Sequence, residues 1–158
     1  MTDFRKSTVY QIYPRSFYDT NGDGFGDLKG VTAKLDYIKE LGVDYIWMTP
    51  FFVSPQYDNG YDVEDYYNID PRYGTMEDFE ELSREAQKRG IKLMLDMVFN
   101  HNSSNHEWFQ KALAGDERYK NYYIFKKGKE DGSAPTNWES KFGGSAWEYV
   151  PEMDEYYL

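Results

Sequence analysis

The sequence predicts an α/β fold in which parallel strands are joined by crossover helices. Three short apolar segments alternate with two segments in which apolar residues recur at helical spacing, an order typical of a parallel sheet. Each predicted helix returns to the sheet through one glycine, Gly42 or Gly90, whereas a long loop follows each predicted strand. This asymmetry favours a (β/α) barrel, because function in barrels lies on the loops that follow the strands. In chain order the segments are 9–13, 28–41, 43–48, 75–89 and 91–99.

The alternative is an open doubly wound sheet. Dinucleotide-binding sheets of that kind carry a glycine-rich fingerprint directly after the first strand. No such fingerprint follows the first predicted strand here, and its absence weakens the open-sheet interpretation.

The first strand and helix are defined by their ends. Val9–Tyr13 is closed by Pro14, and a loop rich in Gly and Asp runs from Asp19 to Asp27 before the helix predicted over Leu28–Leu41. Gly42 stands at the position after the helix where glycine is favoured. The apolar residues at helical spacing are Val31, Leu35, Ile38 and Leu41.

The second strand, Val43–Met48, is ended by Thr49-Pro50, and a long loop over 51–74 follows it. Thr75-Met76-Glu77-Asp78 reads as a capping box that opens the second helix. One apolar stripe on that helix is predicted to face the sheet, and Gly90 ends the helix. The stripe consists of Phe79, Leu82 and Ala86.

The third strand is an apolar run over Ile91–Phe99 that ends abruptly in Asn100 and His101. A continuous apolar run of this length predicts a strand buried on both faces. Because ligands bind at the carboxyl ends of parallel strands, Asn100 and His101 are candidate functional residues.

The pattern changes after residue 101. One helical piece, His106–Ala114, precedes Tyr122–Phe125 and a polar, glycine-rich stretch, and the chain stops at Leu158 in what reads as the middle of a strand. We therefore divide the chain into a barrel part, 1–101, and an incomplete insertion, 102–158. Three strands cannot close a barrel, so we expect the chain to be the N-terminal part of a larger protein.

Composition excludes several classes of partner. The 158 residues carry a net charge of −10, which argues against nucleic acid and anionic membrane as partners. There is no cysteine, no apolar signal segment and no run as long as a membrane span, which together favour a cytoplasmic location. Aromatic residues make up 19% of the chain, a content that suits stacking on sugar rings as well as ordinary packing.

The Asp19–Asp27 loop resembles the first nine positions of a calcium-binding loop. Oxygen ligands fall at alternate positions, and Gly24 is at the sixth, where such loops turn sharply. The twelfth position is Gly30 in place of the usual bidentate Glu, and no helix precedes the loop. We predict a structural Ca²⁺ site, with an Asx-rich turn that holds no metal as the alternative. The predicted ligands are Asp19, Asn21, Asp23, the Phe25 carbonyl and Asp27.

A second polar cluster, Asp58-Asn59-Gly60-Tyr61-Asp62, follows the second strand. Its two carboxylates and its aromatic ring are predicted to lie at the same sheet edge as Asn100 and His101. Carboxylates, an aromatic plane and an imidazole together suit the binding of a sugar, since they offer acceptors for hydroxyls and a face for the ring. Taken alone, His101 is equally consistent with a structural role.

Taken together, these segments resemble the N-terminal part of glycoside hydrolases of the α-amylase family, on the oligo-1,6-glucosidase branch. The resemblance covers essentially the whole chain. Within the branch, residues 137–147 are most similar to the trehalose-6-phosphate hydrolases, because relatives that act on isomaltose-type substrates usually lack Lys at the position of Lys141. The segments that carry the resemblance are 10–17, 19–27, 58–62, 96–101 and 143–147.

The resemblance implies a role for each matching residue. Asp58 would bind hydroxyls of the glucose at the non-reducing end and so select an exo-acting enzyme, while Tyr61 would stack under that ring. His101 would bind its O6 hydroxyl, and Phe142 would pack beside the same subsite. The supporting residues would be Asp62, Asp96 and Asn100.

The catalytic groups are expected elsewhere. Retaining glycosidases need two carboxyl groups about 5–5.5 Å apart, and in this family they follow the fourth and fifth strands, which this chain does not contain. The resemblance implies a retaining exo-acting hydrolase as the complete protein, inactive as this chain alone, with trehalose 6-phosphate as favoured substrate and glucose and glucose 6-phosphate as products. The alternatives are an oligo-1,6-glucosidase or related α-glucosidase and a truncated, non-catalytic sugar-binding protein.

Overall fold

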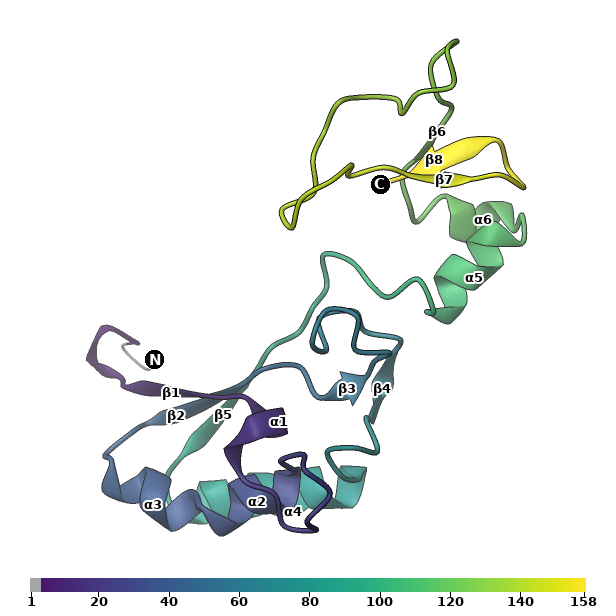
Figure 1. Ribbon diagram of the computed structural model, residues 1–158. Helices are drawn as coiled ribbons and strands as arrows, with labels where there is room; N and C mark the ends of the chain where they lie inside the picture. The colour runs from purple at the N-terminus through teal and green to yellow at the C-terminus, as the bar shows by residue number, and fades with distance from the viewer. Residues whose placement is uncertain (1–3) are drawn as a thin grey trace. The chain divides into compact units, whose positions relative to one another are not determined.

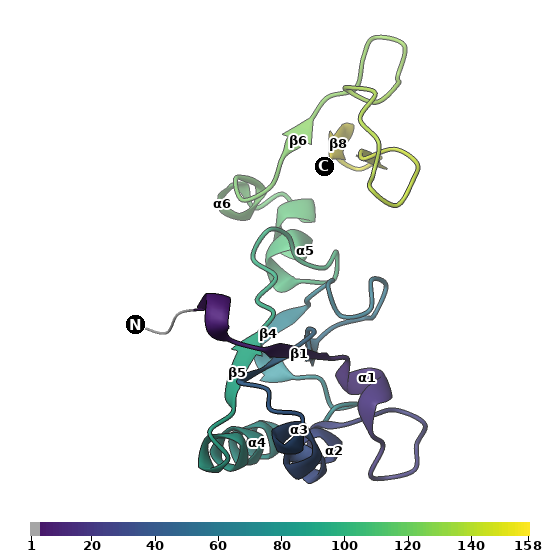
Figure 2. The ribbon, with the colours of Figure 1, turned by 90° about the vertical axis from the view of Figure 1, so that its left-hand side faces the viewer.

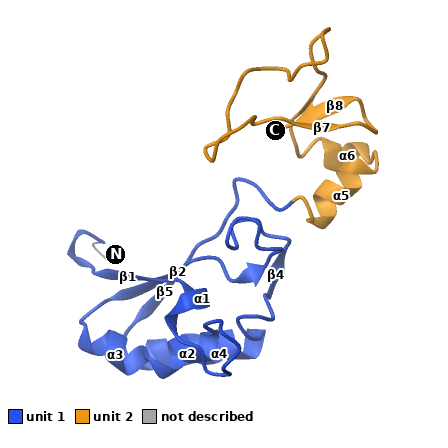
Figure 3. Cartoon of the chain, viewed as in Figure 1, with its two compact units in different colours: residues 1–103 blue, residues 104–158 orange. Residues whose placement is uncertain are grey.

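The computed structural model describes residues 4–158, which form two compact units (Figure 3). The first unit spans residues 1–103 and the second spans residues 104–158. A short 3₁₀ turn, η1 (Phe4–Lys6), opens the described part of the first unit.

The first unit contains a sheet of three parallel strands, as predicted. These strands are β1 (Val9–Ile12), β2 (Tyr45–Met48) and β5 (Lys92–Leu95), with β2 in the middle (Figure 1). The register is regular: Val9 pairs with Tyr45, and Tyr45 pairs with Lys92. Parallel neighbours connected through helices confirm the alternation that the sequence predicts.

Helices cover one face of this sheet. After the single helical turn α1 (Pro14–Phe17), the helices α2 (Leu28–Ala33), α3 (Leu35–Glu40) and α4 (Met76–Lys88) lie along the same side of the strands in both views (Figures 1 and 2).

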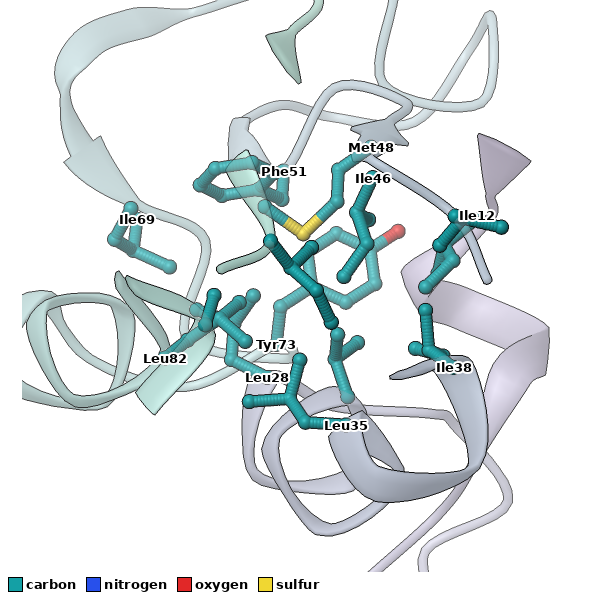
Figure 4. Close-up of a cluster of buried hydrophobic side chains, with 14 residues drawn as sticks. Ile12, Leu28, Leu35, Ile38, Ile46, Met48, Phe51, Ile69, Tyr73 and Leu82 are labelled. Atoms are coloured by element: carbon teal, nitrogen blue, oxygen red, sulfur yellow. The ribbon is translucent and has the colours of Figure 1, made fainter. Parts of the chain in front are cut away.

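The core of the first unit fills the space between sheet and helices. Ile12, Ile46 and Met48 project from the strands onto side chains of the three covering helices (Figure 4). Side chains of this size stabilise the fold by roughly 1.5–3 kcal/mol each when fully buried. The helix residues in this cluster include Leu28, Val31, Leu35, Ile38, Leu82 and Ala86.

The predicted capping box of α4 is confirmed. Thr75 Oγ1 accepts a hydrogen bond from the Asp78 N–H at 3.2 Å, and the Asp78 carboxylate accepts from the Thr75 N–H at 2.9 Å. Both groups satisfy backbone donors that a helix start otherwise leaves unpaired. The predicted glycine ends are confirmed as well, since Gly42 and Gly90 have φ of 73° and 72°.

The helix predicted over 28–41 is interrupted. Lys34 separates α2 from α3 with φ −102° and ψ 7°, and its N–H bonds to the carbonyls of both Gly30 and Val31. One N–H shared between two carbonyls tightens the turn locally and ends the regular ladder. The apolar spacing continues across the break, which is why the sequence pattern does not reveal it.

The segment predicted as one long loop, 51–74, contains a small antiparallel sheet. Strands β3 (Phe52–Val53) and β4 (Asp65–Ile69) pair through Phe52 with Ile69 and Val53 with Asp65, with an irregular register between the two pairs. Strands this short leave little periodic signal in a sequence.

The third strand is shorter and less buried than predicted. β5 ends at Leu95, and Phe99 is largely exposed although Val98 is buried. Within residues 4–158, β5 pairs on one side only, with β2, and helices cover only one face of the sheet. An edge strand covered on one face keeps its side chains half exposed, so the prediction of burial on both faces is wrong for this chain.

The second unit combines two short helices with a three-stranded antiparallel sheet. The helix predicted over His106–Ala114 is confirmed as α5 (Glu107–Leu113), capped by the side chain of His106. Phe109 on that helix packs against the rings of Tyr123, Phe125 and Tyr157. The other elements are α6 (Glu117–Lys120), β6 (Phe125–Lys126), β7 (Glu148–Val150) and β8 (Glu155–Tyr157), with β8 in the middle of the sheet.

Among the described residues, none of the helices is both long enough and apolar enough to cross a membrane.

Candidate sugar-binding site

The carboxyl ends of the three parallel strands meet at one edge of the sheet. The Thr49 N–H donates to the Ile12 carbonyl at 3.0 Å, and the Asp96 N–H donates to the Met48 carbonyl at 3.3 Å. Each of these bonds links the first residue after one strand to the last residue of its neighbour. Tyr13, Thr49 and Asp96 therefore stand in a row at the edge where ligands bind in parallel folds.

The turn that carries Asp58 and Tyr61 is organised by Asp62. This carboxylate is 9% exposed and accepts hydrogen bonds from Ser54 Oγ and from the N–H groups of Tyr57 and Asp58, at 2.7–3.1 Å. Three donors on one buried carboxylate fix the shape of the loop. The structure thus gives Asp62 the position of a support inside the turn and leaves Asp58, half-buried, at its rim.

Gly60 permits the tight approach of this turn to the second strand's end. Its φ is 96°, and a Cβ added there would lie 2.9 Å from the Pro50 carbonyl oxygen. Asn59 before it also has a positive φ, 50°. A residue with a side chain at position 60 would therefore be strained. The Asn59-Gly60 pair allows the tight turn that leads into Tyr61.

Tyr61 is anchored by its hydroxyl group. The hydroxyl donates to Asp96 Oδ2 at 3.0 Å, which links the turn to the end of β5. Burial of the ring, together with the hydrogen bond to Asp96 and that residue's charge, raises the pKa of Tyr61 to about 12. The phenol thus stays protonated and acts as a donor to Asp96.

His101 lies against the same residue. Its Nε2 is 3.1 Å from the Tyr61 carbonyl oxygen, and its Nδ1 is 3.1 Å from the Asn100 amide nitrogen. A carbonyl oxygen only accepts, so Nε2 carries the proton, and Nδ1 accepts from the Asn100 amide. The Tyr61 carbonyl thereby selects the tautomer, and the Asn100 amide complements it. A sugar hydroxyl that binds His101 must share or replace one of these two bonds.

The predicted residues 58, 61, 62, 96, 100 and 101 therefore belong to one connected region of the first unit. Direct hydrogen bonds join Tyr61 to Asp96 and His101, and Asp62 to the backbone of Asp58. Phe142 belongs to the second unit, where its ring is 86% exposed and its N–H donates to Ser140 Oγ at 3.3 Å. The roles of all seven residues in binding a substrate remain predictions.

The predicted calcium loop is closed by hydrogen bonds of its own. Asp19 accepts from the N–H groups of Asn21, Gly22 and Gly24, and the bonds from Gly24 and Gly22 hold its pKa below the usual value. Asp27 caps α2 through the Gly30 N–H at 2.6 Å and accepts from Thr20.

The donor set of that loop has the right chemistry for Ca²⁺, because every predicted ligand is a hard oxygen. Within residues 4–158, no three carboxylate, imidazole or thiol side chains converge closely enough to hold a metal ion. A calcium site in this loop therefore needs the Asn21 amide oxygen and the Phe25 carbonyl in addition to carboxylates.

Two tyrosines at this edge are absent from the sequence prediction. Tyr13 directly follows β1 and is half exposed, so the same strand-end argument that selected His101 could have found it. Tyr66 lies on β4, where its hydroxyl reaches the carbonyls of Val98 and His101. No sequence signal marked Tyr66, because the segment that contains it reads as a loop.

This region brings together carboxylates, an imidazole and an aromatic ring. The Asp96 carboxylate accepts a hydrogen bond from Tyr61, the His101 imidazole contacts both Asn100 and Tyr61, and the ring of Tyr61 is apolar. Groups of these kinds together suit the binding of a sugar. Asp62 and Asp96 both accept hydrogen bonds that hold this turn in place.

Comparison with known proteins gives one family. The family model described as alpha amylase, catalytic domain, matches residues 11–158. The chain is 58% identical over 156 residues to the trehalose-6-phosphate hydrolase of Bacillus subtilis (strain 168) and 54% identical over 156 residues to an oligo-1,6-glucosidase of Bacillus cereus; each alignment covers 98% of this chain and 28% of the relative.

The comparison with solved structures finds proteins of the same kind. The crystal structure of Bacillus licheniformis trehalose-6-phosphate hydrolase superposes with a TM-score of 0.94 at 59% sequence identity, covering 98% of this chain and 28% of that one. The chain therefore spans little more than a quarter of the length of the proteins it matches.

Proposed function

Because the chain belongs to the α-amylase family, we propose that it forms the sugar-binding part of an exo-acting α-glucoside hydrolase. Its three parallel strands with crossover helices are the beginning of the family's (β/α)₈ barrel, as the sequence predicts. In this proposal residues 102–158 belong to the domain inserted after the third strand. Asp58, Tyr61 and His101 bind the terminal glucose, with Asp62, Asp96 and Asn100 as their supports.

One observation carries the proposal: Tyr61 is held at both ends. Its hydroxyl is fixed by Asp96 and its carbonyl by His101, so its ring has one orientation at the edge where the strands end. A rigid aromatic plane flanked by a carboxylate and an imidazole matches a pyranose, whose apolar face stacks while its rim of hydroxyls forms hydrogen bonds.

The reaction proposed for the complete protein is hydrolysis with retention. It requires a nucleophilic carboxylate and a carboxylic acid about 5–5.5 Å apart, which in this family follow strands beyond the third. The part described here contributes binding and orientation of the glucosyl group. We expect this chain alone to bind sugar weakly and to hydrolyse none.

Trehalose 6-phosphate is the substrate we favour, with glucose and glucose 6-phosphate as products. Support comes from the 58% identity to a trehalose-6-phosphate hydrolase and from the segment 137–147 with Lys141. A phosphorylated disaccharide does not cross an apolar bilayer unaided, because burial of its charge is costly. We therefore propose the cytoplasm as the place of action.

The second candidate is an oligo-1,6-glucosidase, since the identity to one such enzyme is 54%, only slightly lower. Both candidates bind the terminal glucose alike and differ in the group beyond the scissile bond. A non-catalytic sugar-binding protein is the third possibility, and the presence or absence of the catalytic carboxylates downstream distinguishes it from the other two.

The test begins with the complete gene product, purified and weighed by mass spectrometry. Trehalose 6-phosphate, trehalose and isomaltose are then supplied at equal concentration, and released glucose is measured. We expect the highest kcat/KM with trehalose 6-phosphate. Isomaltose as the better substrate would transfer the assignment to the second candidate. A native product of 18.7 kDa that cleaves none of the three would exclude catalysis.

A further inference from the structure

Tyr66 links the small antiparallel sheet to the turn that carries His101. It belongs to β4, and its half-buried ring packs between Phe52 and Phe99, with ring centroids 6.2 and 6.1 Å away. These contacts fix the direction of the ring. The hydroxyl at its end consequently reaches one defined place.

That place is the backbone of Val98 and His101, on either side of Phe99 and Asn100. Tyr66 Oη is 2.5 Å from the Val98 carbonyl oxygen and 2.8 Å from the His101 carbonyl oxygen. Both carbonyls only accept, so the single phenolic proton is shared between them. One hydroxyl thus connects the two ends of the turn over residues 98–101.

Other backbone bonds hold the two ends of this turn. Regular pairing of β5 stops at Leu95, so residues 96–103 are not held by a strand ladder. The Asp96 N–H donates to the Met48 carbonyl and the Ser103 N–H donates to the Val63 carbonyl, whereas Tyr66 bonds to the carbonyls of Val98 and His101. Tyr66 therefore holds the backbone of His101 itself.

We propose that Tyr66 is a positioning residue that sets the place of the His101 imidazole against Tyr61. Loss of the hydroxyl frees the His101 carbonyl, and the 3.1 Å contact between His101 Nε2 and the Tyr61 carbonyl then loosens. The consequence for sugar affinity rests on the proposed function. The effect on the imidazole itself does not.

The first measurement reports on the imidazole directly. The complete protein is prepared with isotope-labelled histidine, and the His101 signals are identified by their loss in His101→Ala. Tyr66→Phe keeps the ring and removes only the hydroxyl. Tyr67→Phe removes the same atom from the next residue of β4, whose side chain is 84% exposed, and serves as the matched control. His106, in the second unit, is the internal reference.

We expect Tyr66→Phe to shift the His101 ring nitrogens toward mixed tautomers while the His106 signals stay in place. Tyr67→Phe is expected to shift neither. Unchanged His101 signals in Tyr66→Phe would overturn the proposal. Equal changes at His101 and His106 would overturn it too, because they would mean that Tyr66 acts on the fold as a whole.

The second measurement is kinetic. In Tyr66→Phe we expect KM for the preferred α-glucoside to rise about 3- to 10-fold, the effect of one hydrogen bond, with a smaller change in kcat. In the His101→Ala background the same substitution is expected to have almost no further effect, since a residue that acts through His101 has nothing left to position. Additive effects of the two substitutions would contradict the positioning role.

A wild-type protein that cleaves no α-glucoside would reject the proposed function, and the histidine signals would still decide the role of Tyr66.

Discussion

Tyr61 is held in place through both its side chain and its backbone. Its hydroxyl donates to Asp96, its backbone carbonyl is bonded to His101, and its ring packs partly against the cluster of Phe52, Val63 and Val98. In the proposed function, the exposed part of the ring stacks on the sugar. A platform that is fixed before the ligand arrives loses little entropy on binding. The same bonds make Tyr61 sensitive to pH in a way that can be measured.

Replacement of Tyr61 by Phe is expected to change how stability depends on pH. The pKa of Tyr61 is about 12 in the folded protein against 10.0 for an ordinary tyrosine. Its contribution is therefore fully present below pH 10 and is lost as pH rises toward 12, because the unfolded chain releases the proton first. At neutral pH we expect Tyr61→Phe to be less stable by about 1 kcal/mol, the net worth of one hydrogen bond.

Urea unfolding of the complete protein at neutral pH and at several values between pH 10 and 12 measures the difference in stability between wild type and Tyr61→Phe. The difference between wild type and Tyr61→Phe should narrow as pH rises. A difference that stays constant over the whole range would show that the Tyr61 hydroxyl is not protected by Asp96.

Removal of the His101 side chain is expected to weaken sugar binding more than removal of a neighbour. In His101→Ala we predict a fall in kcat/KM of about 10-fold or more, because in the proposed function a sugar hydroxyl loses its hydrogen-bond partner. Met97→Ala, an exposed residue in the same turn, is the control and should stay close to wild type. Equal losses in the two variants would assign His101 to the fold of the turn.

The strand-end rule brought His101 and the Asp58–Asp62 turn to one place because it depends only on parallel pairing, which the helix-strand alternation reveals. The same rule does not identify Tyr66, which lies within a strand and not at its end. Its role depends on the exact path of the backbone at Val98 and His101, and no periodic pattern encodes that path. Phe142 was named through resemblance alone, and its place toward the sugar is still a prediction.

The start of helix α4 is fixed by hydrogen bonds between Thr75 and Asp78, and the helix then packs on the sheet. Burial acts to raise the pKa of Asp78, but the hydrogen bonds from Thr75 and the charge of Lys29 outweigh it and hold the pKa below 3.8. The contribution of the charged carboxylate is therefore complete above that value and is lost as pH falls below it. The cap points the Leu82 side of the helix at the sheet.

Thr75→Ala is expected to destabilise the protein by about 0.5–2 kcal/mol, the usual cost of a lost N-cap. Ser83→Ala, in the exposed middle of the same helix, removes the same kind of hydroxyl and is expected to change stability by only a few tenths of a kcal/mol. Denaturant unfolding of both variants measures the difference. Equal effects would mean that the capping box adds nothing beyond helix propensity.

Helix ends were predicted better than strand ends for a physical reason. Thr75, Gly42 and Gly90 act through their own backbone and side chain, so their signal is local. The end of β5 at Leu95 and the pairing of β3 with β4 depend on neighbours distant in sequence. An apolar run such as 91–99 therefore overestimates a strand whose partners and cover lie on one side only.

The acidity of the chain as a whole, with a net charge of −10, makes a bound cation favourable wherever oxygens gather. If the 19–27 loop binds Ca²⁺ only in the folded state, a Ca²⁺ concentration 100 times the dissociation constant should add about 2.7 kcal/mol to the stability of the complete protein. Melting is compared in excess Ca²⁺ and in EDTA, and we expect the higher Tm with Ca²⁺.

Two substitutions separate a specific site from a general effect of charge. Asp23→Asn removes the charge of a predicted ligand, and Asp131→Asn removes the same charge from an exposed loop of the second unit. We expect only Asp23→Asn to reduce the shift in Tm. A Tm that is identical with Ca²⁺ and EDTA, or equal losses in both variants, would favour the metal-free Asx-rich turn.

The row of backbone bonds that links Ile12 to Thr49 and Met48 to Asp96 limits where insertions and deletions can be accepted. Deleting one residue within Tyr45–Met48 would turn every later side chain of β2 to the opposite face and move Thr49 out of line with its neighbours. The loops that follow the strands can change length without disturbing that row. We therefore expect related chains to differ in the lengths of these loops while the alignment of Tyr13, Thr49 and Asp96 is preserved.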